Sequence, residues 1–452
     1  MKICIIGAGP AGVAVAKALA LEPVDGLDIH VYERNATAGG LWCYTGKEKE
    51  KVSCTIPATD RRTAKEFGVD GVPYVSAMYE HLETNIVKDI MKYKDIPFPE
   101  KCETFPTRQE VAQYVIDYTK TIPETVQFHF RTTVTSLEKK ERWELTYVDG
   151  NGRQTTDSFD HVVLAHGHFD TPYVPSVKGL VEWSTADPSS IIHAKYFNDV
   201  GRFENKTVLV VGNSASGIDI ATQLTTFASK VVISAASPSP VAEILINDVA
   251  QIGKVDQYNV ADRSVVTVDG ETVTGIDYVI FCTGYLYSIP FLKSYLDGEQ
   301  AILTDGDQVR YVYEQIFYIP DPTLINVALS KNVIPFPFAE CQAQYIARVI
   351  TGREKLPSKE DMLIQYAKDV EEKGEGKSFH DLKFPKDAEY CNHMFDLIAN
   401  SKSEGFVAEY WDEERKALRG KTGDIKAKRL ERIVQHAQQL KKNHEKFRLL
   451  RG

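Results

Sequence analysis

The chain has 452 residues, of which 43% are hydrophobic and 26% charged, and its formal net charge is −10. This length exceeds one compact core and predicts two or three domains, while the acidic balance argues against a nucleic-acid-binding protein. The chain enters a predicted strand at once, without room for a signal peptide, and no apolar run approaches the ~20 residues of a transmembrane helix.

The first predicted elements are a strand, a glycine-rich turn and a helix. The apolar run 3–6 is typical of a buried parallel strand and leads into Gly7-x-Gly9-x-x-Gly12. In such a turn the first glycine permits the bend, the second admits a pyrophosphate and the third lets the helix pack on the strand. The helix predicted at 11–21 directs its N-terminal N–H groups at the phosphates. The predicted cofactor-binding residues here are Gly7, Gly9, Pro10, Ala11 and Gly12.

A second apolar strand, at 29–32, ends at Glu33. This acid follows Gly12 by about 20 residues, the spacing at which a carboxylate accepts a hydrogen bond from a ribose 2′-hydroxyl. Because the carboxylate would repel a 2′-phosphate, the first site is predicted to bind a dinucleotide other than NADP. A glycine turn without a ligand is the alternative.

The next motif is Gly39-Gly40-Leu41-Trp42. Paired glycines allow the backbone to approach a ligand closely. Together with the first turn, this motif predicts that Gly40, Leu41 and Trp42 contact the cofactor. Simple packing of Trp42 is the alternative.

A second strand, turn and helix begin at 208–211. The turn runs from Gly212 to Gly217, with Ser214 in place of the middle glycine. The following strand ends near Ser234 without an acid, which permits a 2′-phosphate and favours NADPH, although no Arg or Lys stands at the strand end to bind that phosphate. The predicted cofactor-binding residues are Gly212, Ser214, Ala215, Ser216 and Gly217.

Two similar stretches flank the second glycine turn. Residues 159–168 and 276–285 each show an acid, an apolar strand, a small residue and glycine. With an acid after the first turn and none after the second, FAD is predicted on the first turn and NADPH on the second. Both stretches are predicted to be strands that close the FAD domain where the chain crosses between domains. The prediction is an α/β fold with two Rossmann-like domains, the NADPH domain inserted into the FAD domain. The expected parts are 1–170 (FAD domain), 171–282 (NADPH domain) and 283–452 (FAD domain and helical C-terminal region).

These motifs resemble the flavin-containing monooxygenases, and most closely their fungal, thiol-oxidising members. The resemblance is carried by GAGPAG, GGLW, YEHLETNIVKDIM at 79–91, GNSASGID, FCTGYLYSIPF and PFPFAECQAQYIARVITG. In the family's identifying stretch, His193 and Phe197 match, whereas Asp187 and Ser189 replace Phe and Gly.

The resemblance implies that NADPH reduces FAD and that the reduced flavin captures O₂ as a C4a-hydroperoxide. The oxygen would pass to a soft nucleophile, a sulfur or nitrogen of a small molecule, with glutathione or cysteamine suggested by the fungal members. The alternatives are a Baeyer–Villiger or N-hydroxylating monooxygenase, an NADPH oxidase that releases H₂O₂, and a non-catalytic nucleotide-binding protein.

The resemblance also assigns residues. Thr84 and Asn85 would lie beside the flavin, with Asn85 as the catalytic residue; a turn or helix N-cap is the alternative for Asn85. Gln342 would lie near the isoalloxazine, or else on a helix surface. His193 is expected to be structural, and no metal site is expected.

The C-terminal segment is highly charged. Leu430, Ile433, Val434, Ala437 and Leu440 form one apolar stripe at helical spacing. A helix packed on the surface is predicted, with attachment to a membrane surface as the alternative.

Seven dispersed cysteines without a C-x-x-C pair predict free thiols in a reducing compartment and argue against a dithiol-type flavin reductase. We expect a cytoplasmic location, leaving open the cytosolic face of the endoplasmic reticulum and a homo-oligomer.

Overall fold

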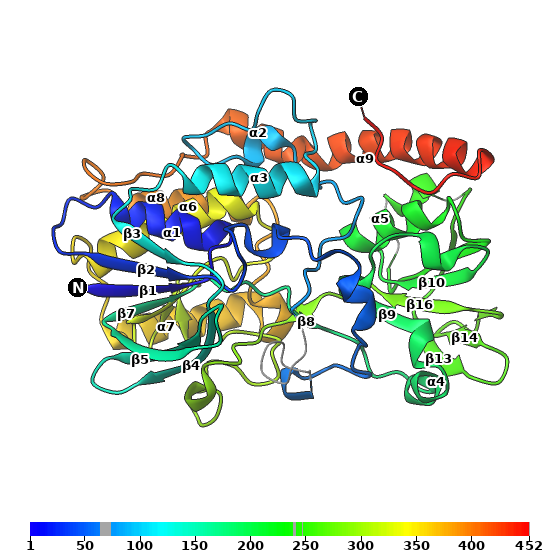
Figure 1. Ribbon diagram of the computed structural model, residues 1–452, viewed down its shortest axis with the longest axis horizontal. Helices are drawn as coiled ribbons and strands as arrows, with labels where there is room; N and C mark the ends of the chain where they lie inside the picture. The colour runs from blue at the N-terminus through cyan, green and yellow to red at the C-terminus, as the bar shows by residue number, and fades with distance from the viewer. Residues whose placement is uncertain (64–73, 238–240, 246, 452) are drawn as a thin grey trace. The chain divides into compact units, whose positions relative to one another are not determined.

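The computed structural model describes residues 1–63, 74–237, 241–245 and 247–451. The chain forms two compact units (Figure 1). Unit 1 comprises Met1–Cys43, Ile86–His168 and Tyr287–Lys421, and unit 2 comprises Tyr44–Asn85, Phe169–Leu286 and Thr422–Gly452. Each unit contains its own largely parallel sheet and one of the two glycine turns, which confirms the predicted α/β class with two Rossmann-like domains.

Unit 1 is built on a seven-stranded sheet in the order β18-β19-β20-β7-β1-β2-β3. Its strands are β1 Lys2–Ile6, β2 Asp28–Tyr32, β3 Val126–His129, β7 His161–Leu164, β18 Val312–Tyr313, β19 Phe317–Tyr318 and β20 Leu324–Asn326. The strands from β20 to β3 pair in parallel, and β18 and β19 extend the sheet in antiparallel fashion. The carboxyl ends of the parallel strands therefore share one edge, where the first glycine turn lies.

Two layers cover this sheet. Helix α1 (Pro10–Ala20) packs against α6 (Pro335–Ile350) on one face, and a three-stranded sheet covers the other, where Trp143 and Leu145 share a core with Cys4 and Ile6 (Figure 1). The small sheet consists of β4 Thr133–Lys139, β5 Trp143–Val148 and β6 Gln154–Phe159. The other helices of unit 1 are α2 Lys88–Met91, α3 Arg108–Thr119, α7 Lys359–Lys373 and α8 Lys386–Leu397. The strands of the seven-stranded sheet thus bury side chains on both faces of the sheet.

Unit 2 has a fully parallel five-stranded sheet in the order β12-β11-β10-β16-β9. Its strands are β9 Ile191–His193, β10 Thr207–Val211, β11 Lys230–Ser234, β12 Ala250–Ile252 and β16 Tyr278–Phe281, and α5 (Ala215–Leu224) follows β10. Smaller elements are α4 Leu180–Ala186, the hairpin sheet β13 Val255–Asn259, β14 Ser264–Thr267 and β15 Thr272–Val273, and the pair β8 Thr171–Pro172 and β17 Tyr285–Leu286.

One expectation about the flanking strands is wrong. The first stretch, 159–168, contains β7 and does belong to the sheet of unit 1, beside β1. The second, 276–285, contains β16, which pairs with β10 and β9 in the sheet of unit 2. The two stretches look alike because each supplies the strand beside its own glycine turn, and sequence alone does not show which sheet a strand joins.

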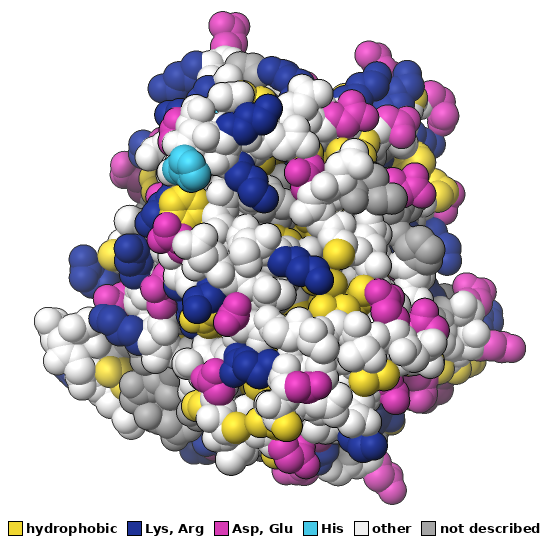
Figure 2. Space-filling model, turned by 90° about the vertical axis from the view of Figure 1, so that its right-hand side faces the viewer, with side chains coloured by type: hydrophobic (Ala, Val, Ile, Leu, Met, Phe, Trp, Pro, Cys, Tyr) yellow, Lys and Arg dark blue, Asp and Glu magenta, His cyan; other side chains and the backbone are white. Residues whose placement is uncertain are grey.

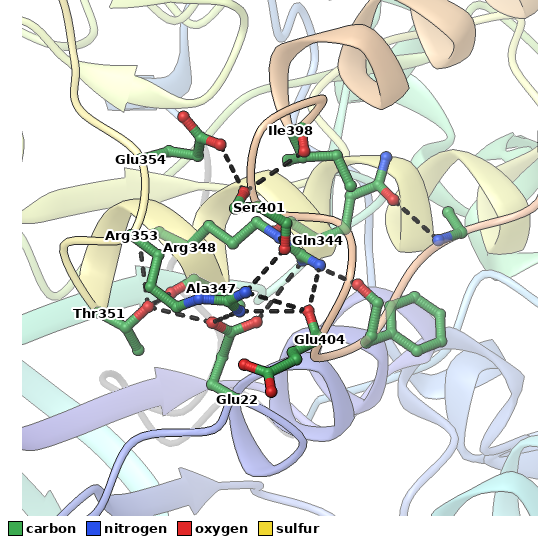
Figure 3. Close-up of polar contacts among 12 residues, drawn as sticks. Glu22, Gln344, Ala347, Arg348, Thr351, Arg353, Glu354, Ile398, Ser401 and Glu404 are labelled. Atoms are coloured by element: carbon green, nitrogen blue, oxygen red, sulfur yellow. Dashed lines mark hydrogen bonds and ion pairs between the residues drawn. The ribbon is translucent and has the colours of Figure 1, made fainter.

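A buried ion cluster secures the C-terminal part of unit 1 (Figure 3). The Glu22 carboxylate, with no exposed side-chain surface, lies 2.8 Å from Arg353 Nη1 and 3.5 Å from Arg348 Nη1. Arg348 also donates to the main-chain carbonyls of Glu404 and Phe406, at 2.9 and 2.8 Å. Because these charges are paired and hydrogen-bonded, the cluster fixes the loop after α8 against the end of α6.

Helix α9 (Glu413–Lys442) carries the apolar stripe predicted near the C-terminus. All five stripe residues are buried, at 1–7% exposure, in the core of unit 2. The prediction of a packed helix is confirmed, and the stripe is not left exposed for a membrane. Within the described ranges, every helix is too short or too polar to cross a bilayer.

Candidate active site

The first glycine turn has the geometry that its sequence predicts. Gly7 has a φ of +106°, and a Cβ there would lie 2.5 Å from the carbonyl oxygen of Ala165 at the end of β7. A Cβ on Gly12 would lie 1.9 Å from the carbonyl oxygen of Gly7. Since real Cβ atoms do not approach so closely, the fold itself requires both glycines.

Gly9 differs from Gly7 and Gly12 because the packing of the protein chain does not require a glycine at this position. Its φ is −73°, and a Cβ there would meet only the main chain of Gly40, with an ordinary 3.5 Å to its Cα. Gly40, by contrast, has a φ of +53°, and its Cβ would lie 2.7 Å from Gly9 Cα. The free space at Gly9, beside the N-terminus of α1, fits a pyrophosphate that approaches the backbone closely.

The other residues predicted for this site lie around the same turn. Pro10 and Ala11 are the first two residues of α1. Leu41 and Trp42 are half-buried in the short 3₁₀ helix Gly40–Trp42. This places the GGLW motif directly beside the glycine turn, since Gly39 N–H donates to the carbonyl of Ala8 at 3.0 Å.

Glu33 lies at the turn, as predicted, directly after β2. It is 4% exposed, and its two carboxylate oxygens accept from the main-chain N–H groups of Ala8 and Asn35, both at 2.8 Å. These bonds hold the carboxylate in one orientation. A carboxylate has about four acceptor positions, so two remain for the hydroxyls of a ribose.

The second turn repeats the first. Gly212 has a φ of +109° and a Cβ there would lie 2.6 Å from the carbonyl oxygen of Cys282, while a Cβ on Gly217 would lie 2.0 Å from the carbonyl oxygen of Gly212. Ser214, Ala215 and Ser216 are exposed at the start of α5. Exposed N–H groups at a helix N-terminus fit a phosphate.

The two turns differ at the residue after the second strand. Gly7 N–H donates to Tyr32 and Gly212 N–H donates to Ser234, each at 2.8 Å, so Tyr32 and Ser234 hold equivalent places. The equivalent of Glu33 is therefore Ala235. An alanine there neither accepts from a ribose hydroxyl nor repels a 2′-phosphate.

A lysine near this position was missed from the sequence because it follows another strand, β12. β12 lies beside β11, and the Ser234 hydroxyl donates to the carbonyl of Gly253 at 2.9 Å. The exposed Lys254 follows directly. Only the pairing of β11 with β12 brings this cation to the strand end, which makes Lys254 the candidate for contact with a 2′-phosphate.

Thr84 and Asn85 belong to unit 2 and end its segment Tyr44–Asn85. Thr84 is buried, whereas Asn85 is exposed. The N-cap of the next helix, α2, is Val87, so the N-cap alternative for Asn85 is wrong. The exposed amide can donate and accept hydrogen bonds without titrating.

Gln342 is buried in α6, so the alternative of a surface glutamine is wrong. Its carbonyl oxygen accepts from Ala328 N–H at 2.7 Å, and its amide donates to the Tyr390 hydroxyl at 2.9 Å. The side chain therefore orders the turn after β20. A role near the isoalloxazine stays a prediction.

His193 is fully buried at the end of β9. Its Nε2 donates to the carbonyl of Gly284 at 3.0 Å, and its Nδ1 accepts from Lys195 N–H at 3.1 Å. Burial lowers the pKa of His193 to about 3, so the ring is neutral at physiological pH. Both nitrogens are used within the fold, which agrees with the expected structural role.

The cysteines also fit the sequence analysis. All seven are free, and Cys282 and Cys341 are 6% and 1% exposed. Burial raises the pKa of the Cys282 thiol, which keeps it protonated and unreactive.

On the face shown in Figure 2, acidic and basic side chains are interspersed and no basic tract is visible.

Comparisons with known proteins agree with this geometry. The model of the family described as FMO-like, flavin-binding monooxygenase-like, matches residues 1–249 and 240–405. The chain is similar to the thiol-specific monooxygenase of Saccharomyces cerevisiae, with 32% identity over 98% of this chain and 96% of that one. It is also 32% identical to the flavin-containing monooxygenase FMO GS-OX-like 9 of Arabidopsis thaliana, over 80% of this chain and 78% of that one.

Among solved structures, S-allyl-L-cysteine S-oxygenase from Allium sativum shares the fold, with a TM-score of 0.78, 24% identity and 99% coverage of both chains. A bacillithiol disulfide reductase from Bacillus cereus shares it less closely, with a TM-score of 0.55, 19% identity, and coverage of 78% of this chain and 100% of that one. With both turns fitting a dinucleotide, the chain belongs to the flavin-binding monooxygenase family and is an enzyme whose cofactors are FAD and NADPH.

Proposed function

We propose that this enzyme transfers one oxygen atom to the sulfur of small thiols, with FAD on the first glycine turn and NADPH on the second. The observation that carries the proposal is the match to a thiol-specific monooxygenase over 98% of this chain. The difference between Glu33 and Ala235 supports the assignment of each cofactor to its turn.

The bound flavin supplies oxygen activation, with electrons from NADPH. One O₂, one NADPH, one proton and one thiol then give a sulfenic acid, NADP⁺ and water. The sulfenic acid condenses with a second thiol to form a disulfide and a second water. The substrate sulfur is itself the nucleophile, so the protein needs no activated serine or cysteine.

In this proposal, the residues of the chain bind the cofactors and orient the reacting groups. The N–H groups at the start of α1 and the space at Gly9 receive a pyrophosphate, and Glu33 accepts from ribose hydroxyls. Asn85, whose exposed amide neither gains nor loses a proton, acts as a hydrogen-bond donor at the reacting centre. Lys254 is proposed to contact the 2′-phosphate of NADPH.

The test is a panel of cysteamine, glutathione, a sulfide and an amine, assayed for NADPH consumption, H₂O₂ release and oxygenated product by mass. We expect thiol-dependent NADPH consumption with an equal amount of product. Equal H₂O₂ release with and without thiol would instead show an NADPH oxidase, and product from the amine alone would show an N-hydroxylating enzyme.

Asn85→Ala tests the catalytic assignment. We expect it to retain flavin and lose most oxygenated product, with H₂O₂ released in its place. A normal product yield would refute the role of Asn85 and leave the cofactor assignment standing.

A further inference from the structure

A buried carboxylate next to Thr84 and Asn85 is paired with two cations from the C-terminal helix. The Glu83 side chain is 2% exposed, and Lys426 Nζ and Arg429 Nη2 lie 2.8 and 2.9 Å from its two oxygens. Lys426 and Arg429 are one helical turn apart on α9, so they project from the same face. All three residues belong to unit 2.

The helix that carries these cations is itself fixed. Leu430, Ile433 and Val434 are buried in a core shared with Tyr79 and with Ile218 of α5. The Arg429 side chain is only 9% exposed. The two cations are thus carried by a packed helix, and the buried Arg429 side chain loses little further freedom when it pairs with Glu83.

The same contacts continue into the backbone before Asn85. Lys426 Nζ donates to the Thr84 carbonyl at 2.9 Å, which is the peptide group that leads into Asn85. Further back, the amide of Gln223 donates to the His81 carbonyl at 3.2 Å, and the Tyr79 hydroxyl contacts the Asp219 carboxylate. The segment before Asn85 is therefore held by α5 and α9, whereas Asn85 itself is exposed.

We propose that Lys426 and Arg429 are positioning residues for oxygen transfer: through Glu83 and the Thr84 carbonyl, helix α9 fixes the backbone that presents Asn85. This inference rests on the role proposed for Asn85. A buried carboxylate that loses a cation must move toward water or take up a proton, and either change shifts the adjoining backbone. The C-terminal helix thereby becomes part of the active-site architecture.

The experiment compares Arg429→Met, Arg429→Lys and Lys428→Met in the full-length, flavin-loaded enzyme. Lys428 is the exposed neighbour of Arg429 on α9 and serves as the matched control. Two quantities are measured: amide hydrogen exchange of the peptide spanning residues 79–87, and the H₂O₂ released per NADPH with cysteamine as the substrate. Flavin content and the KM for NADPH report on the cofactor sites.

We expect Arg429→Met to speed exchange at residues 84–86 by about tenfold and to raise the H₂O₂ fraction severalfold, with flavin content and the KM for NADPH as in Lys428→Met. Arg429→Lys should restore most of both readouts. Exchange and H₂O₂ release equal to those of the control would overturn the proposal.

If Arg429→Met does not fold, Glu83→Gln decides by the same two readouts. A rise in exchange and H₂O₂ release in Glu83→Gln supports the proposal, and values equal to those of Lys428→Met reject it. Hydrogen exchange does not depend on turnover. Faster exchange together with normal oxygenation by Asn85→Ala would therefore show that the role of Asn85 had failed while α9 still orders the segment.

Discussion

The two glycine turns have nearly the same backbone but carry different side chains. Gly7 and Gly212 have φ values of +106° and +109°, and Gly12 and Gly217 each face the carbonyl of the first glycine of the turn at a distance that no Cβ could occupy. Among the differences are Gly9 against Ser214, Glu33 against Ala235, and Ala14 against Asp219. The shared part builds the turn, and in our proposal the variable part selects the ligand.

The largest expected effect comes from the shared part. In Gly12→Val or Gly217→Val, the new Cβ would lie 1.9 or 2.0 Å from a carbonyl oxygen, so the turn must open at a cost above about 3 kcal/mol. Gly12→Val should yield protein without flavin, whereas Gly217→Val should retain flavin and lose NADP⁺ binding.

The measurements are flavin absorbance per protein and titration with NADP⁺. Gly423→Val is the control, since a Cβ at Gly423 meets no atom within 4 Å. Loss of flavin from Gly217→Val alone would show that the two turns are assigned to the wrong cofactors.

The difference between Ala14 and Asp219 should appear in the pH dependence of stability. Burial raises the pKa of Asp219 from 3.8 to about 6, despite the contact with the Tyr79 hydroxyl. Between about pH 4 and 6 the folded protein therefore holds a proton on Asp219 that the unfolded chain releases, and the contribution of Asp219 to the free energy of unfolding falls as the pH rises through this range.

Asp219→Asn removes this titration. Between the lower and the higher pH, the free energy of unfolding of the wild type should therefore change by about 2 kcal/mol more in the destabilising direction than that of the variant. Urea unfolding at pH 4.5 and 7.5 measures the change, with Asp256→Asn as an exposed control on the same unit. Identical pH profiles for the wild type and Asp219→Asn would mean that Asp219 has an ordinary pKa.

The smallest effect should come from exchanging the residue after the second strand. Ala235→Glu gives the second turn the acid of the first, and its carboxylate should repel a 2′-phosphate. We expect the preference for NADPH over NADH to fall about tenfold, or about 1.4 kcal/mol, with little change in stability. The ratio of kcat/KM for the two coenzymes measures it, and an unchanged ratio would show that Ala235 does not face the 2′ position.

The sequence was sufficient where a feature depends on neighbouring residues. Both glycine turns, the place of Glu33 after β2 and the apolar stripe of α9 follow from local spacing, and the structure contains each of them. Glycine spacing and helical periodicity are local constraints, so they are visible without knowledge of the fold.

The sequence was insufficient where distant segments meet. The stretch around β16 has the same pattern as that around β7, and only strand pairing assigns it to the second sheet. The sequence places Gln342 on a helix but does not show that its side chain forms hydrogen bonds with Ala328 and Tyr390. Such contacts depend on packing between elements that the local pattern does not specify.

By itself, then, the sequence determined that two dinucleotide turns exist and that only the first is followed by an acid. The tertiary structure decided that Ala235 is the counterpart of Glu33, that Lys254 reaches the end of β11, and that Arg429 meets Glu83 across 346 residues of chain. The physical reason is that backbone geometry is encoded in adjacent side chains, whereas the pairing of buried charges is fixed only when the helices and strands have packed together.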